Sequence, residues 1–138
     1  MAEVYNPGEY RRYLQSGFDY LYDKVGLYDT LRAVVRGEAS ASCITGQWQC
    51  VDDIRTHMLY FLENHDEQRI ASDFFAGSGE KARPGLAVSA FMGTNPLMIY
   101  AGQELGERGM DAEGFSGRDG RTTIFDYWGV KSIQAWAN

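Results

Sequence analysis

The feature that most constrains the fold is a run of four apolar residues, 59–62 (LYFL), followed at once by the polar stretch 63–66 (ENHD). A strand that is apolar on both faces is typical of parallel sheets, because helices cover both sides of such a sheet. The abrupt change after residue 62 marks the end of the strand. The sequence therefore predicts a fully buried parallel strand over residues 59–62, suited to the wall of a barrel.

The rest of the chain alternates short apolar runs with stretches that have helical spacing. Between residues 27 and 37, for example, Leu27, Leu31 and Val34 lie on one face of a helix, and Gly37 is a natural stop. This alternation favours an α/β architecture with parallel strands. The other predicted elements are strands over 18–22 and 96–100, helices over 51–58 and 82–91, a surface connection over 37–47, a loop over 73–79, and a long loop after 102 with a helix near 131–137.

Composition narrows the class of ligand. The 138 residues carry a net charge of -6, which disfavours nucleic acid or an anionic membrane as the principal partner. No apolar run approaches the roughly 20 residues of a membrane helix, and the first ten residues lack a signal-peptide layout. Cys43 and Cys50 could be free buried thiols or one small bridge, so the compartment stays open. The spacing of these cysteines and His57 matches no common zinc pattern, and we expect no metal.

Polar residues follow each predicted strand at its C-terminal end, where parallel α/β folds and barrels bind their ligands. They are Glu3 and Asn6 after the first few residues, Asp23 after the strand ending at 22, the stretch 64–66, and the pair Gln103 and Glu104. Hydrolysis of a glycosidic bond needs one carboxylic acid to protonate the leaving oxygen and a second carboxylate as nucleophile or base. Carboxylates grouped with His, Asn, Gln and aromatic residues suit that task.

Three segments resemble signature regions of the alpha-amylase family of glycoside hydrolases, in the family's order and spacing. Residues 61–66 (FLENHD) are similar to the fourth region, and residues 2–5 (AEVY) to the third region, whose Glu ends barrel strand five. Residues 96–104 (PLMIYAGQE) are similar to the strand-eight segment. The resemblance implies an α/β fold that is part of a TIM (β/α)8 barrel, from the end of strand 5 through strand 8, with residues 1–138 forming one incomplete catalytic barrel domain.

The resemblance also implies roles for individual residues. Glu3 would be the general acid/base, and Asp66 would be the carboxylate that stabilises the transition state. His65 would hydrogen-bond sugar hydroxyls, and Asn64 would also contact substrate. Gln103 and Glu104 would shape the site from the eighth strand. Arg69, Gln68 and Asp23 would have no more than a supporting place.

The implied activity is cleavage of alpha-glucosidic bonds in starch-like substrates or maltooligosaccharides by a retaining mechanism. The family's nucleophile is an Asp on strand four, two residues after an Arg, and this chain has no such segment. We therefore expect a fragment that is inactive alone. Its strands ending near 22 and 100 would have unpaired edges, so it should pair with the missing barrel half or self-associate. The resemblance implies that the complete enzyme could bind calcium, with ligands largely outside this chain.

Several readings stay open beside this one. Glu3 could be an ordinary solvated carboxylate, Asp66 could be the N-cap of a helix through Ala71, and Gln103 with Glu104 could cap a turn after Gly102. The whole protein could instead be a glucosyl transferase or isomerase of the same family, or a non-catalytic carbohydrate-binding relative. Residues 77–81 are closer to a flexible connection than to a phosphate loop, and residues 111–121 indicate a solvated loop or part of a substrate rim.

Overall fold

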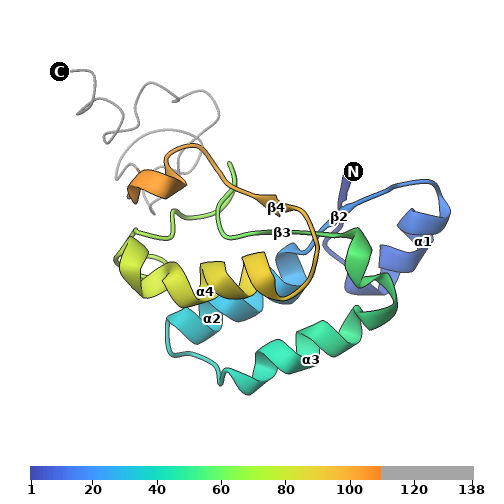
Figure 1. The fold of residues 1–138 in the computed structure, drawn as a ribbon, viewed down its shortest axis with the longest axis horizontal. Helices are drawn as coiled ribbons and strands as arrows, with labels where there is room; N and C mark the ends of the chain where they lie inside the picture. Colours follow the sequence, from blue (N-terminus) through green and yellow to red (C-terminus); the bar gives the residue numbers. More distant parts are fainter. Residues whose placement is uncertain (110–138) are drawn as a thin grey trace. The chain divides into compact units, whose positions relative to one another are not determined.

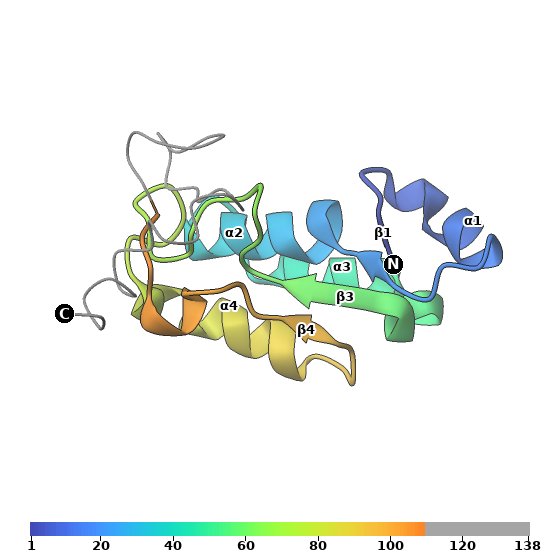
Figure 2. The ribbon, with the colours of Figure 1, turned by 90° about the horizontal axis from the view of Figure 1, so that it is seen from above.

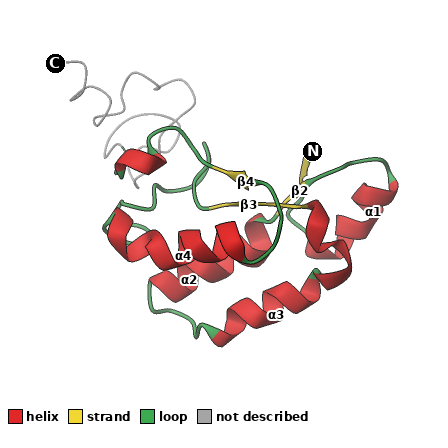
Figure 3. Ribbon diagram, viewed as in Figure 1, coloured by secondary structure: helices red, strands yellow, loops and turns green. Residues whose placement is uncertain are grey.

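The computed structural model describes residues 1–109, in which short strands alternate with helices (Figures 1 and 3). The stretches 111–121 and 131–137, for which a loop and a helix are predicted, lie outside the described residues. The elements are β1 (Ala2–Glu3), the 3-10 helix η1 (Pro7–Glu9), α1 (Tyr10–Gln15), β2 (Leu21–Tyr22), the π-helix η2 (Lys24–Tyr28), α2 (Asp29–Val35), α3 (Ser42–Cys50), the 3-10 helix η3 (Asp52–His57), β3 (Met58–Phe61), α4 (Gly79–Phe91), β4 (Leu97–Met98) and the 3-10 helix η4 (Gln103–Leu105).

The four strands form one parallel sheet in the order β1-β2-β3-β4, so that each strand pairs with the next one along the chain. Leu21 is aligned with Ala2 on one side and with Met58 on the other. The predicted α/β fold with parallel strands is confirmed at this level. The prediction of an unpaired edge at the strand ending near residue 22 is wrong, because Ala2–Glu3 is long enough to pair with it; among residues 1–109 the edge strands are β1 and β4.

The sheet is built around β3, where all four residues are buried, as predicted from the apolar run. Phe61 is the centre of an aromatic cluster. Its ring stacks on Tyr28, with centroids 5.1 Å apart and an interplanar angle of 12°, and meets the edge of Tyr22 at 5.2 Å. Aromatic side chains bury large areas and favour such offset or edge-on pairs. This cluster fixes η2 and β2 against β3.

The helices differ from the predictions in three places. The segment 37–47, predicted as a surface connection, contains the start of α3, which lies with α2 on one side of the strands (Figures 1 and 2). Gly46 and Thr45 are weak helix formers, so the sequence does not predict a helix there. The helix predicted over 51–58 is the 3-10 helix η3, and Met58 already belongs to β3. The helix predicted from residue 27 begins earlier, as a π-helical turn at Lys24, and buries Leu27 and Leu31.

The chain divides into two compact units. Unit 1 consists of residues 1–61 and 85–98 and holds the whole sheet; unit 2 consists of residues 62–84 and, among the described residues, 99–109. The boundary falls inside α4, between Pro84 and Gly85. No helix among residues 1–109 is long and apolar enough to span a membrane.

Candidate functional site

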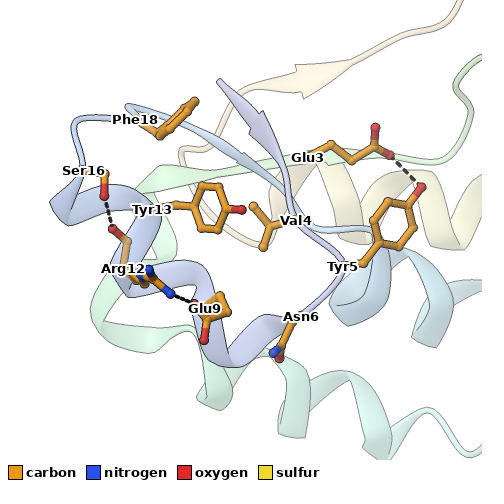
Figure 4. Close-up of a pocket in the computed structure, with 9 residues that line it drawn as sticks. All are labelled: Glu3, Val4, Tyr5, Asn6, Glu9, Arg12, Tyr13, Ser16 and Phe18. Atoms are coloured by element: carbon orange, nitrogen blue, oxygen red, sulfur yellow. Dashed lines mark hydrogen bonds and ion pairs between the residues drawn. The ribbon is translucent and has the colours of Figure 1, made fainter.

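Glu3 is the last residue of β1 in unit 1. The Tyr5 hydroxyl donates a hydrogen bond to Glu3 Oε1 over 3.2 Å, and Figure 4 shows the two side chains turned toward each other. Glu3 is exposed. A tyrosine donor thus contacts the carboxylate at the C-terminal end of its strand.

A cavity of about 610 Å³ lies beside Glu3, between β1 and one face of α1. The Tyr13 ring points toward Val4 in Figure 4, and the Tyr13 and Phe18 rings are 5.6 Å apart. These three side chains give the cavity apolar walls. Its lining consists of Glu3, Val4, Tyr5, Asn6, Glu9, Arg12, Tyr13, Ser16 and Phe18.

The polar groups around this cavity bond to one another. Arg12 pairs with Glu9 at 3.1 Å, Ser16 Oγ donates to the Arg12 carbonyl at 2.9 Å, and Asn6 Oδ1 accepts from the Gly8 amide at 3.0 Å. Sugar recognition needs polar groups that converge on the ligand.

Asp23, which follows β2, is buried at the N-terminal end of η2. It accepts hydrogen bonds from the Tyr10 hydroxyl at 3.3 Å and from the backbone amides of Gly26 and Leu27. Burial raises the pKa of Asp23, while these hydrogen bonds work in the opposite direction. Burial and the neighbouring Asp23 charge also raise the pKa of Tyr10. All of these partners are internal, so Asp23 holds the first turn of η2 in place.

The segment after β3 forms a turn in unit 2 that is organised by Asn64. The buried Asn64 side-chain oxygen accepts from the backbone amides of Asp66 at 2.9 Å and Glu67 at 2.8 Å. The alternative of a helix capped by Asp66 is wrong, since no helix follows and Asn64 supplies the cap to a turn instead. Because its oxygen is used twice, Asn64 offers a ligand only its amide nitrogen.

His65 and Asp66 are the accessible residues of this turn. His65 Nε2 lies 3.3 Å from Asp66 Oδ2, and the two side chains are 47% and 35% exposed. An imidazole and a carboxylate held side by side at the surface can bind sugar hydroxyls as donor and acceptor. The structure thus brings three predicted site residues together within one turn.

A buried ion pair lies directly beside the turn. Glu63 Oε2 accepts from Arg69 Nη1 at 2.7 Å, and the two side chains are 0% and 1% exposed. Glu63 Oε1 also accepts from the Ile70 amide at 2.7 Å. Burial raises the pKa of Glu63, and the Arg69 charge opposes this rise. The Arg69 guanidinium lies 4.6 Å from the centroid of the Tyr100 ring.

Gln103 and Glu104 lie in η4, which follows a left-handed Gly102 with φ of 89°. Gln103 Oε1 accepts from the Tyr100 amide at 3.3 Å, so the alternative of a turn-capping role fits Gln103. Its amide nitrogen is buried and has no acceptor among residues 1–109. A buried donor of this kind is costly unless a ligand or water satisfies it, which suits a binding residue. Glu104 is exposed.

Sequence reasoning missed the buried charges of unit 2. The sequence predicts no more than a supporting place for Arg69, and the site residues predicted from it do not include the buried charges Glu63 and Glu107. A signal for Glu63 was present, because it follows a fully apolar strand without a turn residue between them. A carboxylate in that position is buried and needs a cation, and Arg69 is the nearest one along the chain.

The described residues contain no group of three or more His, Cys, Asp or Glu side chains that could hold a metal ion. Cys43 and Cys50 are free and exposed, so both sequence-based alternatives, buried thiols and a bridge, are wrong. Both residues lie on α3, which buries none of its side chains.

The predicted site residues thus belong to two groups. Glu3 lies in unit 1, whereas Asn64, His65, Asp66, Gln103 and Glu104 lie in unit 2. Comparisons of the chain with protein-family models, with curated proteins and with solved structures gave no match.

Proposed function

We propose that this chain is the second half of a TIM (β/α)8 barrel of the alpha-amylase type, and that it supplies one side of a site that cleaves alpha-glucosidic bonds. The observation that carries the proposal is the strand order. Four parallel strands pair in chain order, β1-β2-β3-β4, without a reversal. Open doubly wound sheets change direction at a switch point, whereas barrels continue in one direction. The order favours an arc of a barrel.

The positions of the polar residues support the same reading. Glu3 ends β1, and the turn with His65 and Asp66 begins just after β3. Each therefore follows the C-terminal end of a parallel strand, which is where barrel enzymes carry their catalytic groups. In this proposal Glu3 is the general acid/base and Asp66 stabilises the positive charge that develops on the sugar ring.

His65 is proposed to bind sugar hydroxyls next to the bond that breaks. Its imidazole is accessible, and its orientation is set by the adjacent Asp66 carboxylate. The Asn64 and Gln103 amide nitrogens and the Glu104 carboxylate are proposed as further substrate contacts. Glu3 would act as an acid only if substrate binding removed water from its exposed carboxyl group.

In the proposed family the nucleophile is an Asp that follows an Arg by two residues, and the 138-residue sequence contains no such segment. A retaining glycosidase needs that carboxylate to form its covalent intermediate. We therefore expect this chain to bind maltooligosaccharides without releasing reducing ends.

The test is a titration of the chain with maltoheptaose, followed by NMR, together with an assay for reducing ends. His65→Ala should weaken binding by about tenfold, since a hydrogen-bonding partner of the sugar is lost. His57→Ala is the matched control. It removes the chain's other histidine, which lies in unit 1 and contacts the Asp19 carbonyl at 2.9 Å.

Two results would count against the proposal. The first is no binding of maltoheptaose by a folded chain. The second is an equal loss of binding in the His65 and His57 variants, because the turn after β3 would then have no special part in recognition.

A further inference from the structure

The buried Glu63–Arg69 pair and Tyr100 form a support beneath the turn that carries His65 and Asp66. We propose that Glu63, Arg69 and Tyr100 are positioning residues, whose role is to hold that turn in a binding geometry. The part of this inference that concerns sugar rests on the proposed function. The part that concerns the geometry of the turn does not.

The Glu63 carboxylate joins the two ends of the turn. One carboxylate oxygen accepts from Arg69 Nη1 and the other from the Ile70 amide, each at 2.7 Å. Residue 63 is thereby joined to residues 69 and 70, and the stretch 64–68 between them must form a compact turn. Hydrogen bonds to a charged group are the strong ones, and burial excludes water from competing for them.

Asn64 fixes the backbone between these two ends. Its side-chain oxygen holds the amides of Asp66 and Glu67, so both ends and the middle of the turn are restrained. His65 and Asp66 are the residues left accessible, 3.3 Å from each other. The buried contacts and the exposed pair thus belong to one connected structure.

Arg69 links this turn to the segment that follows β4. Its guanidinium stacks over the Tyr100 ring at 4.6 Å, and Tyr100 is joined by two hydrogen bonds to Gln103. The backbone amide of Gln103 donates to the Tyr100 carbonyl at 2.9 Å, and the backbone amide of Tyr100 donates to Gln103 Oε1 at 3.3 Å. One arginine therefore relates the turn 64–68 to the turn that carries Gln103 and Glu104.

Stability alone is a poor reason for such an arrangement. Taking two charges out of water costs as much as their attraction returns, and apolar residues of similar volume often stabilise a fold equally well. The buried carboxylate of Glu107 also raises the pKa of Glu63, which adds to the cost. The charged pair instead fixes the relative orientation of the side chains, because a planar guanidinium bonds a carboxylate and stacks on a ring in a defined geometry.

The experiment compares Glu63→Gln with the double variant Glu63→Gln/Arg69→Met. The single variant leaves the Arg69 charge buried without its partner, and the double variant removes both charges while an acceptor for the Ile70 amide remains. We expect the single variant to unfold at lower urea concentration and the double variant to recover most of that loss. In both variants the Asp66 and Glu67 amides should exchange with solvent at least about tenfold faster.

The matched control is an exposed ion pair of the same unit, Arg108 with Asp73 at 2.7 Å, whose side chains are 55% and 80% exposed. Asp73→Asn should leave the exchange of the Asp66 and Glu67 amides unchanged. Arg69→Lys should restore only part of the protection, since lysine keeps the charge but cannot stack as a planar group on Tyr100.

Wild-type exchange of the Asp66 and Glu67 amides in the double variant would overturn the proposal, because the pair would then serve stability only. A maltotriose titration of the same proteins separates the two claims. If the wild-type chain does not bind maltotriose, the proposed function fails while the exchange result still decides whether these residues position the turn. If it binds, both variants should bind more weakly than Asp73→Asn.

Discussion

Gly26 shows how tightly a single residue can be constrained. Its backbone amide donates to the buried Asp23 carboxylate, and a Cβ atom built on Gly26 would overlap Asp23 Oδ1. The φ angle of Gly26 is ordinary, so the requirement for glycine comes from contact and not from backbone conformation.

We expect Gly26→Ala to destabilise the fold by about 1–3 kcal/mol, because the Asp23 side chain must move to make room for the added methyl group. Gly46→Ala is the control. Gly46 lies inside α3 with nothing near its Cβ position, so alanine there should stabilise by up to about 1 kcal/mol through helix propensity. Urea unfolding of both variants is the measurement, and equal effects would contradict the contact argument.

Asp23 gives the fold a predictable dependence on pH. Burial raises its pKa in the folded state above the usual aspartate value, so the folded state holds the proton more tightly than the unfolded state does. The stability that Asp23 contributes is therefore complete below the usual pKa and is lost as pH rises through the raised value.

Asp23→Asn should remove this contribution to the pH dependence while keeping an oxygen that accepts from Gly26 and Leu27. Between pH 3 and 7, which spans the usual aspartate pKa of about 3.9, the variant should gain stability relative to wild type as pH rises. Unfolding midpoints across that range measure the difference. The buried Glu63 contributes the same pH dependence to both proteins, so its effect cancels in their difference. If the difference in unfolding midpoint between the two proteins does not change with pH, the pKa of Asp23 is the same in the folded and unfolded states.

At the scale of elements, α4 contains a proline where a helix usually has none. Pro84 is exposed and lies five residues after the first residue of α4, so the Glu80 carbonyl lacks its helical donor. Proline in a helix interior costs about 3 kcal/mol relative to alanine, partly offset because proline also restricts the unfolded chain.

We expect Pro84→Ala to stabilise the protein by about 1–2 kcal/mol, measured by urea unfolding. Ala87→Gly, at another exposed position of α4, should cost up to about 1 kcal/mol and shows whether this helix responds to propensity at all. If Pro84→Ala destabilises while Ala87→Gly behaves as expected, Pro84 makes a contribution to the fold that alanine cannot replace.

The elements that sequence predicts well here are those with strong apolar patterns. The run 59–62 is buried in and directly after β3, and the spacing of Leu27 and Leu31 locates the buried face of η2 and α2. The helix α3 could not be predicted, because it buries none of its residues and so has no apolar stripe. Only contacts with neighbouring elements, which a pattern does not contain, explain why it forms.

The candidate site was predictable to a similar degree. A polar residue after a buried strand is visible in the sequence and identifies the turn 64–66, whereas Glu3, in the short and exposed β1, is identified by the resemblance of residues 2–5. The use of the Asn64 oxygen to cap two amides was not visible, because the same residue could equally bind a ligand. Which side chains face inward, as Glu63 does, depends on where the chain turns after the strand.

At the scale of the whole molecule, the sheet ends at β1 and β4, and each edge strand has one side without a neighbour among the described strands. The Ala2 amide donates to the Tyr20 carbonyl at 2.9 Å. Successive amides of a strand point to opposite sides, so the Glu3 amide points to the outer edge, next to the cavity lined by Val4 and Tyr13. Unpaired edges of this kind accept further strands.

We expect the chain to associate as its concentration rises, measured by sedimentation velocity. If β1 is the edge that pairs, the Glu3 amide should become protected from hydrogen exchange with rising concentration. The Ala2 amide, which is already bonded, is an internal control whose protection should not change. A monomer at all concentrations, or association without protection of Glu3, would contradict this use of the β1 edge.

The two exposed thiols on α3 have a consequence for that experiment. Cys43 and Cys50 are seven positions apart in one helix, which separates them by about 10 Å along the axis and rules out a bridge between them. These are the chain's two cysteines, so air oxidation can link them only to other molecules. Covalent dimers formed in this way would imitate strand pairing in a sedimentation profile. Association at the β1 edge must therefore persist under reducing conditions and in a variant with both cysteines changed to serine.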